Sequence, residues 1–469
     1  MVFSSLTFLY VFLPLNLLLY YLSRNIVYRN IVLILFSFMF YAWGEPIYIF
    51  LLLGSATLDY FNGLFVDRYR HTHWAKWGVV FTLLVNLGVL ALFKYADFFL
   101  ENINQAFGLQ ISKPGWALPI GISFYTFQTI SYVIDVYRNT VPVQRSWGKF
   151  MLFVSLYHQL VAGPIVRYAD IAHEIDHRKF DAFDVGRGVF RFCLGLFKKV
   201  VFANVAGEFV QQYMAGDISD LTTGGAWFGL LMFSLQIYFD FSAYSDMAIG
   251  LGWMFGFHYL ENFNYPYLAK SATEFWRRWH ISLGTFFRDY VYIPLGGKER
   301  RPYLNLFIVW GLTGLWHGAS WNFILWGLYF GLLIALERLF LSKVLEAIPR
   351  FISHLYLLFA AVIGWALFYF DNRLNDLLTF LQRLFVDDHG GWDAMLLQNL
   401  RENAIWIFLA LLLCLPIYHW VKRAVIPWWY KRNTWLAWSM VLGACLVLLM
   451  VSTSMLVGKS YNPFIYYRF

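Results

Sequence analysis

The chain is poor in charge and in cysteine. Only 14% of its 469 residues are charged and 60% are hydrophobic, whereas soluble globular proteins are about 25% charged. The three cysteines, Cys193, Cys414 and Cys445, lie far apart in apolar segments, which excludes a disulfide framework and the close Cys spacing of a zinc site. We interpret them as core residues, and the composition as that of an integral membrane protein.

The signatures of several enzyme classes are also missing. The sequence has no Gly-x-Ser-x-Gly nucleophile elbow, no Walker loop and no glycine-rich dinucleotide fingerprint. No Pro/Gly/Ser-rich linker and no internal repeat divides it, so we expect one integral membrane domain over residues 1–469. The net charge of +8 is typical of the excess of Lys and Arg in cytoplasmic loops, and we expect no nucleic-acid partner.

Long apolar runs predict an all-α, polytopic protein with about 11–12 membrane segments, because one span needs ~20 mostly apolar residues. The runs are Phe3–Leu22, Ile31–Trp43, Ile47–Val66, Trp77–Tyr95, Met151–Val166, Gly188–Ala203, Ala226–Trp253, Tyr303–Trp316, Trp321–Leu336, Phe351–Phe370, Ile405–His419 and Trp435–Val457. Arg24 and Arg29 follow the first run and no positive residue precedes it. Because positive residues prefer the cytoplasmic side, we expect the N-terminus outside.

Two other stretches, Leu118–Asp135 and Tyr265–Gly297, mix apolar residues with hydroxyls, amides and charges. Polar or irregular backbone at membrane depth is tolerated only where protein buries it or where it lines a wet cavity. We therefore expect re-entrant or interfacial helices around a central chamber. The charge pattern does not orient the middle of the chain, from residue 138 to residue 298.

One histidine, His317, stands inside the otherwise apolar stretch Leu306–Asn322. An ionisable group is costly at bilayer depth and is therefore a functional candidate. Neutral imidazole can take a proton from a hydroxyl and return it near neutral pH. Gly311, Gly314 and Gly318 would allow a backbone or a substrate chain to come close. The alternative is a buried histidine that hydrogen-bonds a neighbouring helix.

A second histidine, His280, lies in a segment that mixes aromatic with charged residues, where an interfacial role is the alternative to catalysis. If this segment is helical, Trp276, Arg277 and His280 share one face. Trp310, Trp316 and Trp321 would wall the site around His317 and keep it dry. We assign donor or substrate binding to five residues: Trp276, Arg277, Trp316, Trp321 and Asn322.

Two further patterns have competing interpretations. His173-Glu-Ile-Asp-His177 fits the zinc-protease pattern His-Glu-x-x-His, but the surrounding run is very polar and shows no convincing third ligand. We favour a solvated loop and expect no metal. A polar stripe from Gln236 to Asp246 includes Asp240. Intramembrane carboxylates are proton relays or join helices, and we favour the second role or cavity lining.

The most specific motifs are Phe275-Trp-Arg-Arg-Trp-His-Ile-Ser-Leu283, Arg288-Asp-Tyr-Val-Tyr-Ile-Pro-Leu-Gly-Gly297 and Leu315-Trp-His-Gly-Ala-Ser-Trp321, with support from Phe124–Tyr137 and Ala162–Arg167. In these motifs, and over nearly its whole length, the chain resembles the membrane-bound O-acyltransferase (MBOAT) family. The bacterial branch that O-acetylates exported polysaccharides, such as alginate, is the most similar.

The resemblance implies a ring of helices around a chamber that tunnels reach from both membrane faces. His317 matches the family's active-site histidine, and His280 matches a second catalytic position that is Asn, Asp or His in different branches. The implied donor is a cytoplasmic thioester, for which acetyl-CoA fits. The implied acceptor is an exported polysaccharide or a periplasmic esterase-like acetyltransferase, and membrane lipid surrounds the chain in the bacterial inner membrane.

We therefore predict acetyl transfer to a hydroxyl, with His317 as general base and His280 orienting the reactants or stabilising charge. Three alternatives stay open. D-alanyl transfer to teichoic acid would use a carrier-protein donor. A proton-coupled transporter would use the histidines as a relay. An intramembrane metalloprotease would bind its metal at His173 and His177.

Overall fold

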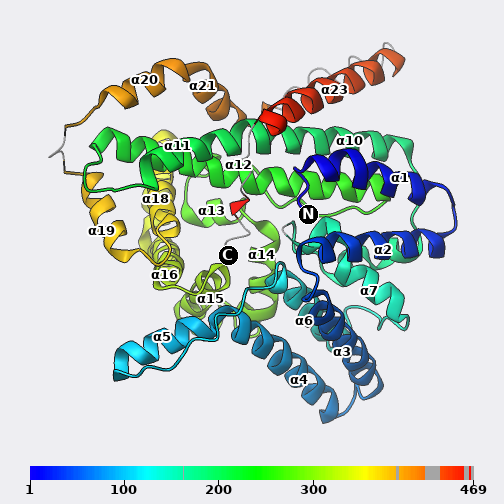
Figure 1. Cartoon of the computed structure of the whole chain (residues 1–469). Coiled ribbons are helices and arrows are strands. Elements are labelled where there is room, and N and C mark those ends of the chain that lie inside the picture. Colours follow the sequence, from blue (N-terminus) through cyan, green and yellow to red (C-terminus); the bar gives the residue numbers. More distant parts are fainter. Residues whose placement is uncertain (162, 387–389, 418–433, 459–463, 466–469) are drawn as a thin grey trace. The chain divides into compact units, whose positions relative to one another are not determined.

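The computed structural model describes residues 1–161, 163–386, 390–417, 434–458 and 464–465 (Figure 1). Within these residues every regular element is a helix and no strand is present, so the predicted all-α class is confirmed. The chain divides into two compact units, one of Met1–Phe192 with Tyr244–Glu261 and the other of Cys193–Ala243 with Asn262–Phe469. The single integral domain expected over residues 1–469 stays a prediction.

Unit 1 is built around buried aromatic side chains. Phe3 stacks on Tyr244 with ring centroids 4.6 Å apart, and Phe40 lies 5.3 Å from Tyr157. Almost every residue of α6 is buried, because this helix packs against both α3 and α4. The helices are α1 (Leu13–Tyr21), α2 (Ile26–Gly44), α3 (Ile49–Arg68), α4 (His73–Leu90), α5 (Ala96–Phe107), α6 (Ile122–Tyr137), α7 (Trp147–Ser155), α8 (Tyr157–Leu160), α9 (Tyr168–Asp176) and the first part of α10 (Ala182–Phe197), with π-helical η1 (Phe8–Phe12) and η2 (Ala91–Tyr95).

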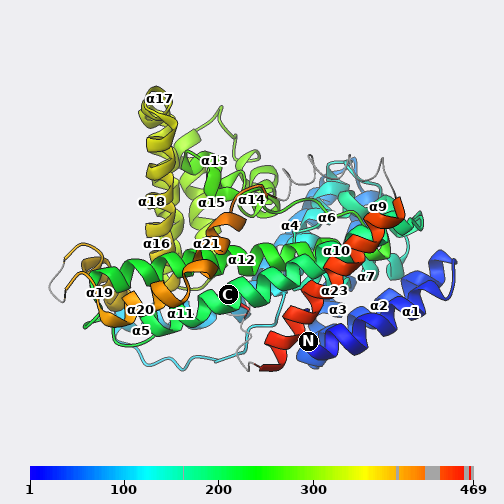
Figure 2. The same cartoon turned by 90° about the horizontal axis from the view of Figure 1, so that it is seen from above.

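Unit 2 has its core where α15, α16 and α18 pack side by side (Figure 2). Its helices are α11 (Asn204–Met214), α12 (Thr223–Phe255, whose last turns belong to unit 1), α13 (Ala272–Trp276), α14 (Ile281–Phe287), α15 (Pro302–His317), α16 (Trp321–Leu336), α17 (Ser342–Ala347), α18 (Arg350–Tyr369), α19 (Leu374–Arg383), α20 (Ala394–Glu402), α21 (Ala404–Leu413) and α23 (Thr434–Gly458), with η3 (Lys198–Ala203), η4 (Pro266–Leu268), η5 (Arg288–Tyr292) and η6 (Glu337–Leu341). The three cysteines are unpaired and buried, as core residues should be.

Six helical stretches in the described residues are long and apolar enough to cross a membrane: Ile26–Gly44, Ile49–Arg68, His73–Phe107, Trp321–Ala347, Arg350–Tyr369 and Trp438–Gly458. The pair α20 and α21, bent by 67°, would make a seventh. The polytopic class is confirmed, with fewer full-length spans than apolar runs. The reason is that hydropathy does not detect chain breaks: Met151–Val166, for example, contains α7, a break at Leu156, and the single turn α8.

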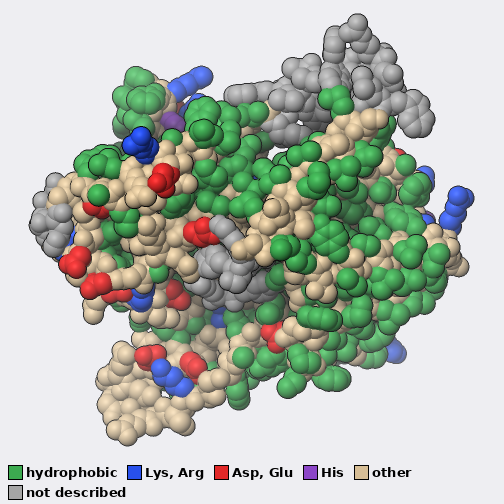
Figure 3. All heavy atoms as spheres, turned by 45° about the horizontal axis from the view of Figure 1, so that its top comes forward, with side chains coloured by type: hydrophobic (Ala, Val, Ile, Leu, Met, Phe, Trp, Pro, Cys, Tyr) green, Lys and Arg blue, Asp and Glu red, His purple; other side chains and the backbone are tan. Residues whose placement is uncertain are grey.

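The surface matches a lipid environment. Figure 3 shows apolar side chains over much of one face, and large apolar residues such as Ile47, Phe50 and Ile405 are more than 70% exposed. Soluble monomers rarely expose contiguous apolar patches larger than a few hundred Å². The chain is therefore a multi-pass membrane protein.

Candidate active site

The α15–α16 hairpin is held together by glycine. A Cβ on Gly314 would lie 2.2 Å from the carbonyl oxygen of Phe323, and a Cβ on Gly327 would lie 2.2 Å from that of Trp310. Only glycine lets the two backbones approach this closely, as small residues do between membrane helices. The close backbone approach predicted for Gly314 is therefore confirmed. Gly318 is crowded by the Phe323 ring and not by a backbone, and Gly311 has no neighbour within 4 Å, so no backbone approaches it.

His317 is the last residue of α15 and is 2% exposed. Its ring contacts four aromatic rings from three helices, with centroid distances of 4.8 Å to Trp316, 5.0 Å to Trp326, 5.2 Å to Phe368 and 6.5 Å to Phe323. Because α15, α16 and α18 each supply part of this wall, the ring is fixed by packing. The surroundings are apolar, as a water-excluding site requires.

His280 does not lie within a helix. It caps the N-terminus of α14 with φ +45° and ψ +54°, a left-handed conformation that bulky residues rarely adopt. Two backbone hydrogen bonds fix this break, because Ile281 N donates to Asn262 O at 3.0 Å and Asn264 N donates to Arg278 O at 2.9 Å. The helical face expected to join Trp276, Arg277 and His280 was therefore wrong. Strained backbone of this kind is concentrated at functional sites.

The His280 side chain is 2% exposed and is held by polar and aromatic contacts. Its Nδ1 lies 3.2 Å from Oδ1 of Asn262, and its ring centroid lies 4.6 Å from that of Phe241 in α12. Burial lowers the pKa of His280 to about 3. The ring is therefore neutral at pH 7, with one nitrogen protonated and the other able to accept a hydrogen bond.

Trp316 links the two histidines. Its ring centroid lies 4.8 Å from that of His317 and 5.7 Å from that of His280. The residues come from two separate segments of unit 2, α15 and the α13–α14 break. Two histidines on one buried indole could handle a proton in an apolar setting, which is the chemistry that acyl transfer to a hydroxyl needs.

The other predicted site residues differ in how deeply they are buried. Trp276 is partly buried and packs 5.3 Å from Trp326, which itself contacts His317. Asn322 is buried at the start of α16. Trp321 is 51% exposed and does not wall the site, whereas Arg277 is exposed and its assignment to donor binding stays a prediction. Trp326 takes the place expected of Trp321. Helix α16 is apolar all round, so its sequence does not show which tryptophan faces inward.

The sequence interpretation missed Glu337, a buried carboxylate in η6 that holds the N-terminus of α13. Its Oε1 accepts from Ala272 N at 2.6 Å, and its Oε2 accepts from Thr273 N at 2.9 Å and Thr273 Oγ1 at 2.6 Å. A carboxylate at a helix N-terminus is favoured by the helix dipole. The signal was available, because Glu337 is an ionisable residue within the apolar stretch Trp321–Ala347.

The polar stripe on α12 joins helices, as favoured from the sequence. In unit 2, Asp240 forms a buried ion pair of 2.6 Å with Lys199, and its Oδ2 accepts from Ile465 N at 2.7 Å. In unit 1, Asp246 pairs with Arg191 at 2.9 Å. These carboxylates therefore stabilise packing.

The His-Glu-x-x-His pattern gains no support as a metal site. The rings of His173 and His177 stack with centroids 5.0 Å apart, while Glu174 is hydrogen-bonded to His258. Within the part of the chain that the structure describes, no group of three His, Cys, Asp or Glu side chains is placed to hold a metal ion. The metalloprotease alternative has no geometric basis here.

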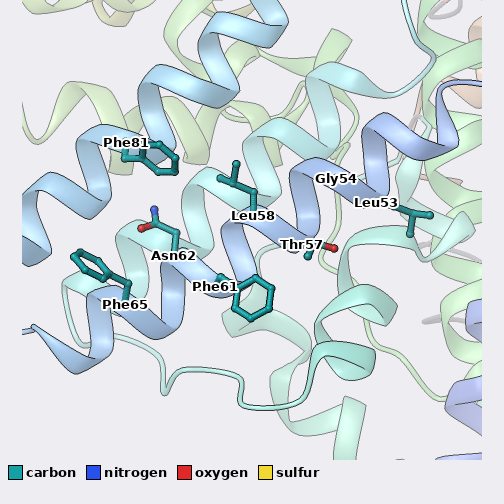
Figure 4. A pocket seen from close by; sticks show the side chains of 8 residues that line it. All are labelled: Leu53, Gly54, Thr57, Leu58, Phe61, Asn62, Phe65 and Phe81. Carbon is teal, nitrogen blue, oxygen red and sulfur yellow. The ribbon is translucent and has the colours of Figure 1, made fainter.

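The groove in Figure 4, with a volume of about 770 Å³, is a different feature. It belongs to unit 1 and is lined by residues of α3 and by Phe81 of α4: Leu53, Gly54, Thr57, Leu58, Phe61, Asn62 and Phe65. None of these side chains titrates in the physiological range, and the two helices are candidate spans. The groove therefore offers no side chain of its own for proton transfer.

The fold and the site together define a class of protein. It is a polytopic, α-helical membrane protein in which two buried histidines meet on one tryptophan, with a strained backbone at one of them.

Comparison with known proteins identifies the family. The family model for membrane-bound O-acyltransferases matches residues 144–375, which include both histidines and Trp316. The probable alginate O-acetylase AlgI of Pseudomonas aeruginosa is 43% identical over 79% of this chain and 72% of its own. That of Pseudomonas putida is 37% identical over the full length of both. The peptidoglycan O-acetyltransferase of Helicobacter pylori is 35% identical over 72% of this chain and 70% of its own. The chain belongs to the membrane-bound O-acyltransferase family.

This result confirms the resemblance read from the motifs and identifies the chain as an enzyme of O-acyl transfer. It favours neither the transporter nor the metalloprotease alternative. Sequence similarity does not test the roles of individual site residues.

Proposed function

We propose that this enzyme takes acetyl from a thioester on the cytoplasmic face and delivers it for O-acetylation of an exported polysaccharide. Acetyl-CoA is the proposed donor. The observation that carries the proposal is the meeting of His317 and His280 on Trp316 in a buried, aromatic setting. The alginate O-acetylases among its relatives support a polysaccharide as the final acceptor.

In the proposed reaction His317 is the general base. It takes the proton from the acceptor hydroxyl as the oxygen attacks the thioester carbonyl carbon. The tetrahedral intermediate then expels the thiolate, the C–S bond breaks, and the proton returns to sulfur, leaving an oxygen ester and a thiol. His280 orients the reactants beside it. The apolar wall of Trp316, Trp326 and Phe368 keeps water from hydrolysing the thioester.

The immediate acceptor is either the sugar hydroxyl or a serine of a periplasmic esterase-like acetyltransferase that completes the transfer. The proposed location is the bacterial inner membrane, with the N-terminus outside. The positive charges Arg24 and Arg29 after the first apolar run support this orientation.

The test uses cells that make an acetylated exopolysaccharide and lack their own O-acetylase. They carry the wild-type chain, His317→Ala, or His71→Ala as an exposed-histidine control, at matched membrane levels. Loss of a positioned base costs roughly 10²–10⁴-fold in rate. We expect base-released acetate from the secreted polymer to disappear with His317→Ala alone. Unchanged acetate in that variant would contradict the proposal.

Peptidoglycan is a second candidate acceptor, because a peptidoglycan O-acetyltransferase is 35% identical to this chain. The same cells decide between the two. Acetate that is lost from muropeptides and not from the secreted polymer identifies peptidoglycan. Loss of D-alanine esters from teichoic acid, with acetate unchanged, would identify D-alanyl transfer instead.

A further inference from the structure

Asn262 is 0% exposed and lies beside His280. Its Oδ1 is within hydrogen-bond distance of three donors or potential donors: Ser282 N at 3.1 Å, Ser282 Oγ at 2.9 Å and His280 Nδ1 at 3.2 Å. A side chain this deeply buried, and with this many partners on one atom, has little freedom to rotate.

The network fixes which Asn262 atom is oxygen. A backbone N–H is always a donor, so the atom 3.1 Å from Ser282 N must be an acceptor. Only the amide oxygen accepts, so the NH₂ group points the other way. The orientation of the Asn262 amide is therefore set by Ser282 N and not by an assumption about His280.

The same oxygen then fixes the His280 tautomer. An amide oxygen offers no proton, so Nδ1 of His280 must supply the hydrogen in its contact with Oδ1. In a neutral imidazole the other nitrogen, Nε2, then carries the lone pair. A nitrogen with a lone pair accepts a hydrogen bond and cannot donate one to an oxyanion.

We propose that Asn262 is a positioning residue that holds His280 as the Nδ1–H tautomer, so that Nε2 accepts a hydrogen bond from a second hydroxyl of the acceptor, beside the one that His317 deprotonates, and does not stabilise the thioester oxyanion. This inference rests on the proposed function and deepens it, because it assigns His280 to the alcohol side of the reaction. Three further contacts of the ring are with groups that do not titrate near neutral pH: Ser282 Oγ, 3.5 Å from Nδ1, and the rings of Phe241 and Trp316.

The first experiment exchanges the amide for a carboxylate. Asn262→Asp keeps an oxygen for all three contacts and places a negative charge beside Nδ1. Such a charge favours the imidazolium and raises its pKa by roughly 1–3 units. Because only the neutral ring accepts through Nε2, the acid limb of the kcat/KM profile for acetyl transfer should move to higher pH.

The matched control is Asn264→Asp, which adds the same charge at an exposed position two residues away. Its acid limb should coincide with that of the wild type. If Asn262→Asp also leaves the acid limb in place while remaining active, Asn262 does not act through His280 and the inference is wrong.

The second experiment is a double-mutant cycle in membranes with radiolabelled acetyl donor. Asn262→Leu removes the acceptor at similar volume and should lower kcat/KM by roughly 10²-fold, as misplacement of a reacting group does. In the His280→Ala background the same change should cost nothing further. An equal loss in both backgrounds would mean a structural role and would overturn the proposal.

Failure of the proposed function gives a different result. Wild-type membranes then transfer no acetyl at all. In that case the double-mutant cycle is measured as the stability of each purified variant to thermal unfolding. Asn262→Leu must then cost less stability in the His280→Ala background than in the wild type, because its partner is already gone. Equal costs would overturn the inference independently of the reaction.

Discussion

His317 and His280 contact the same tryptophan, yet the protein holds them by different means. His317 ends a regular helix and is surrounded by aromatic rings of α15, α16 and α18, with the backbone pressed against α16 through Gly314. His280 lies at a break between two short helices, in a left-handed conformation, and is fixed by hydrogen bonds to Asn262. In the contacts described, His317 is supported by the shape of its aromatic surroundings and His280 by a side-chain hydrogen bond.

The difference matters because the two kinds of support fail differently. Close packing of backbones tolerates no added atom, whereas a polar network tolerates changes of shape and fails when a donor or acceptor is left unpaired. A general base needs a fixed position above all. A histidine that accepts a hydrogen bond from a hydroxyl also needs a defined tautomer. The variants below test this contrast.

The largest effect is expected from adding atoms at the hairpin. Gly314→Leu would place a Cβ 2.2 Å from the Phe323 carbonyl oxygen, a backbone atom that cannot rotate away. Overpacking costs typically about 1–3 kcal/mol and occasionally more, and a rigid backbone contact favours the upper end of that range. We expect little folded protein in detergent, measured by size-exclusion chromatography and tryptophan fluorescence on heating.

Gly311→Leu is the matched control on the same helix, three residues earlier, where a Cβ meets open space. It should fold at least as well as the wild type, because leucine has a higher helix propensity than glycine. Equal damage from both substitutions would show that His317 is not held by the α15–α16 approach.

A smaller effect is expected at Glu337, which holds the N-terminus of α13, the helix that precedes His280. Glu337→Gln places an NH₂ group against the backbone N–H donors of Ala272 or Thr273, and so leaves a buried donor without an acceptor. This costs roughly 1.5–3 kcal/mol. The midpoint of thermal unfolding should fall, and transfer activity should fall with it. Glu346→Gln, exposed on α17, should change neither.

Trp316→Leu tests the residue that the two histidines share. Removing the indole takes a packing partner from both rings, and a misplacement of about 1 Å can cost 10²-fold in rate. We expect kcat, measured per folded molecule, to fall by that order, while the cavity left by the indole also lowers the thermal midpoint. Trp77→Leu, on an exposed face of α4, is the control. A Trp316→Leu enzyme with normal kcat would remove this residue from the site.

The smallest effect is expected at His258, an exposed contrast to the two buried histidines. Burial alone would lower its pKa, but hydrogen bonds to Glu174 and Asp184 outweigh burial and raise the pKa above its ordinary value. A raised folded-state pKa means that the contribution to stability is complete below the ordinary pKa of about 6.5. The contribution is then lost as pH rises through the folded-state pKa.

Thermal unfolding of wild type and His258→Gln between pH 5.5 and pH 8.5 measures this contribution. The two midpoints should differ at the acid end and converge at the alkaline end. His71→Gln, an exposed histidine elsewhere in unit 1, should track the wild type throughout. Curves for His258→Gln that run parallel to the wild type would mean that His258 stabilises without its charge.

Much of the site could be read from the sequence because the membrane makes ionisable residues conspicuous. His317 is the one ionisable residue in the apolar stretch Leu306–Asn322, and the structure buries it among aromatic rings. The same rule applied to Glu337 would have marked it as a candidate, but not its partner, the N-terminus of α13. Trp321 and Arg277 were assigned by proximity in sequence, and the structure places both on the surface.

Composition and local motifs were enough to predict the membrane class, the family and the two candidate histidines, because apolar runs and motifs depend on residues that lie near one another in the chain. How the two histidines are held depends on tertiary contacts. The break at His280, the contact with Asn262 18 residues away, and the bonds from Glu337 to Ala272 across 65 residues join separate segments. No local pattern specifies such partners, since a polar group finds them only when packing brings the segments together.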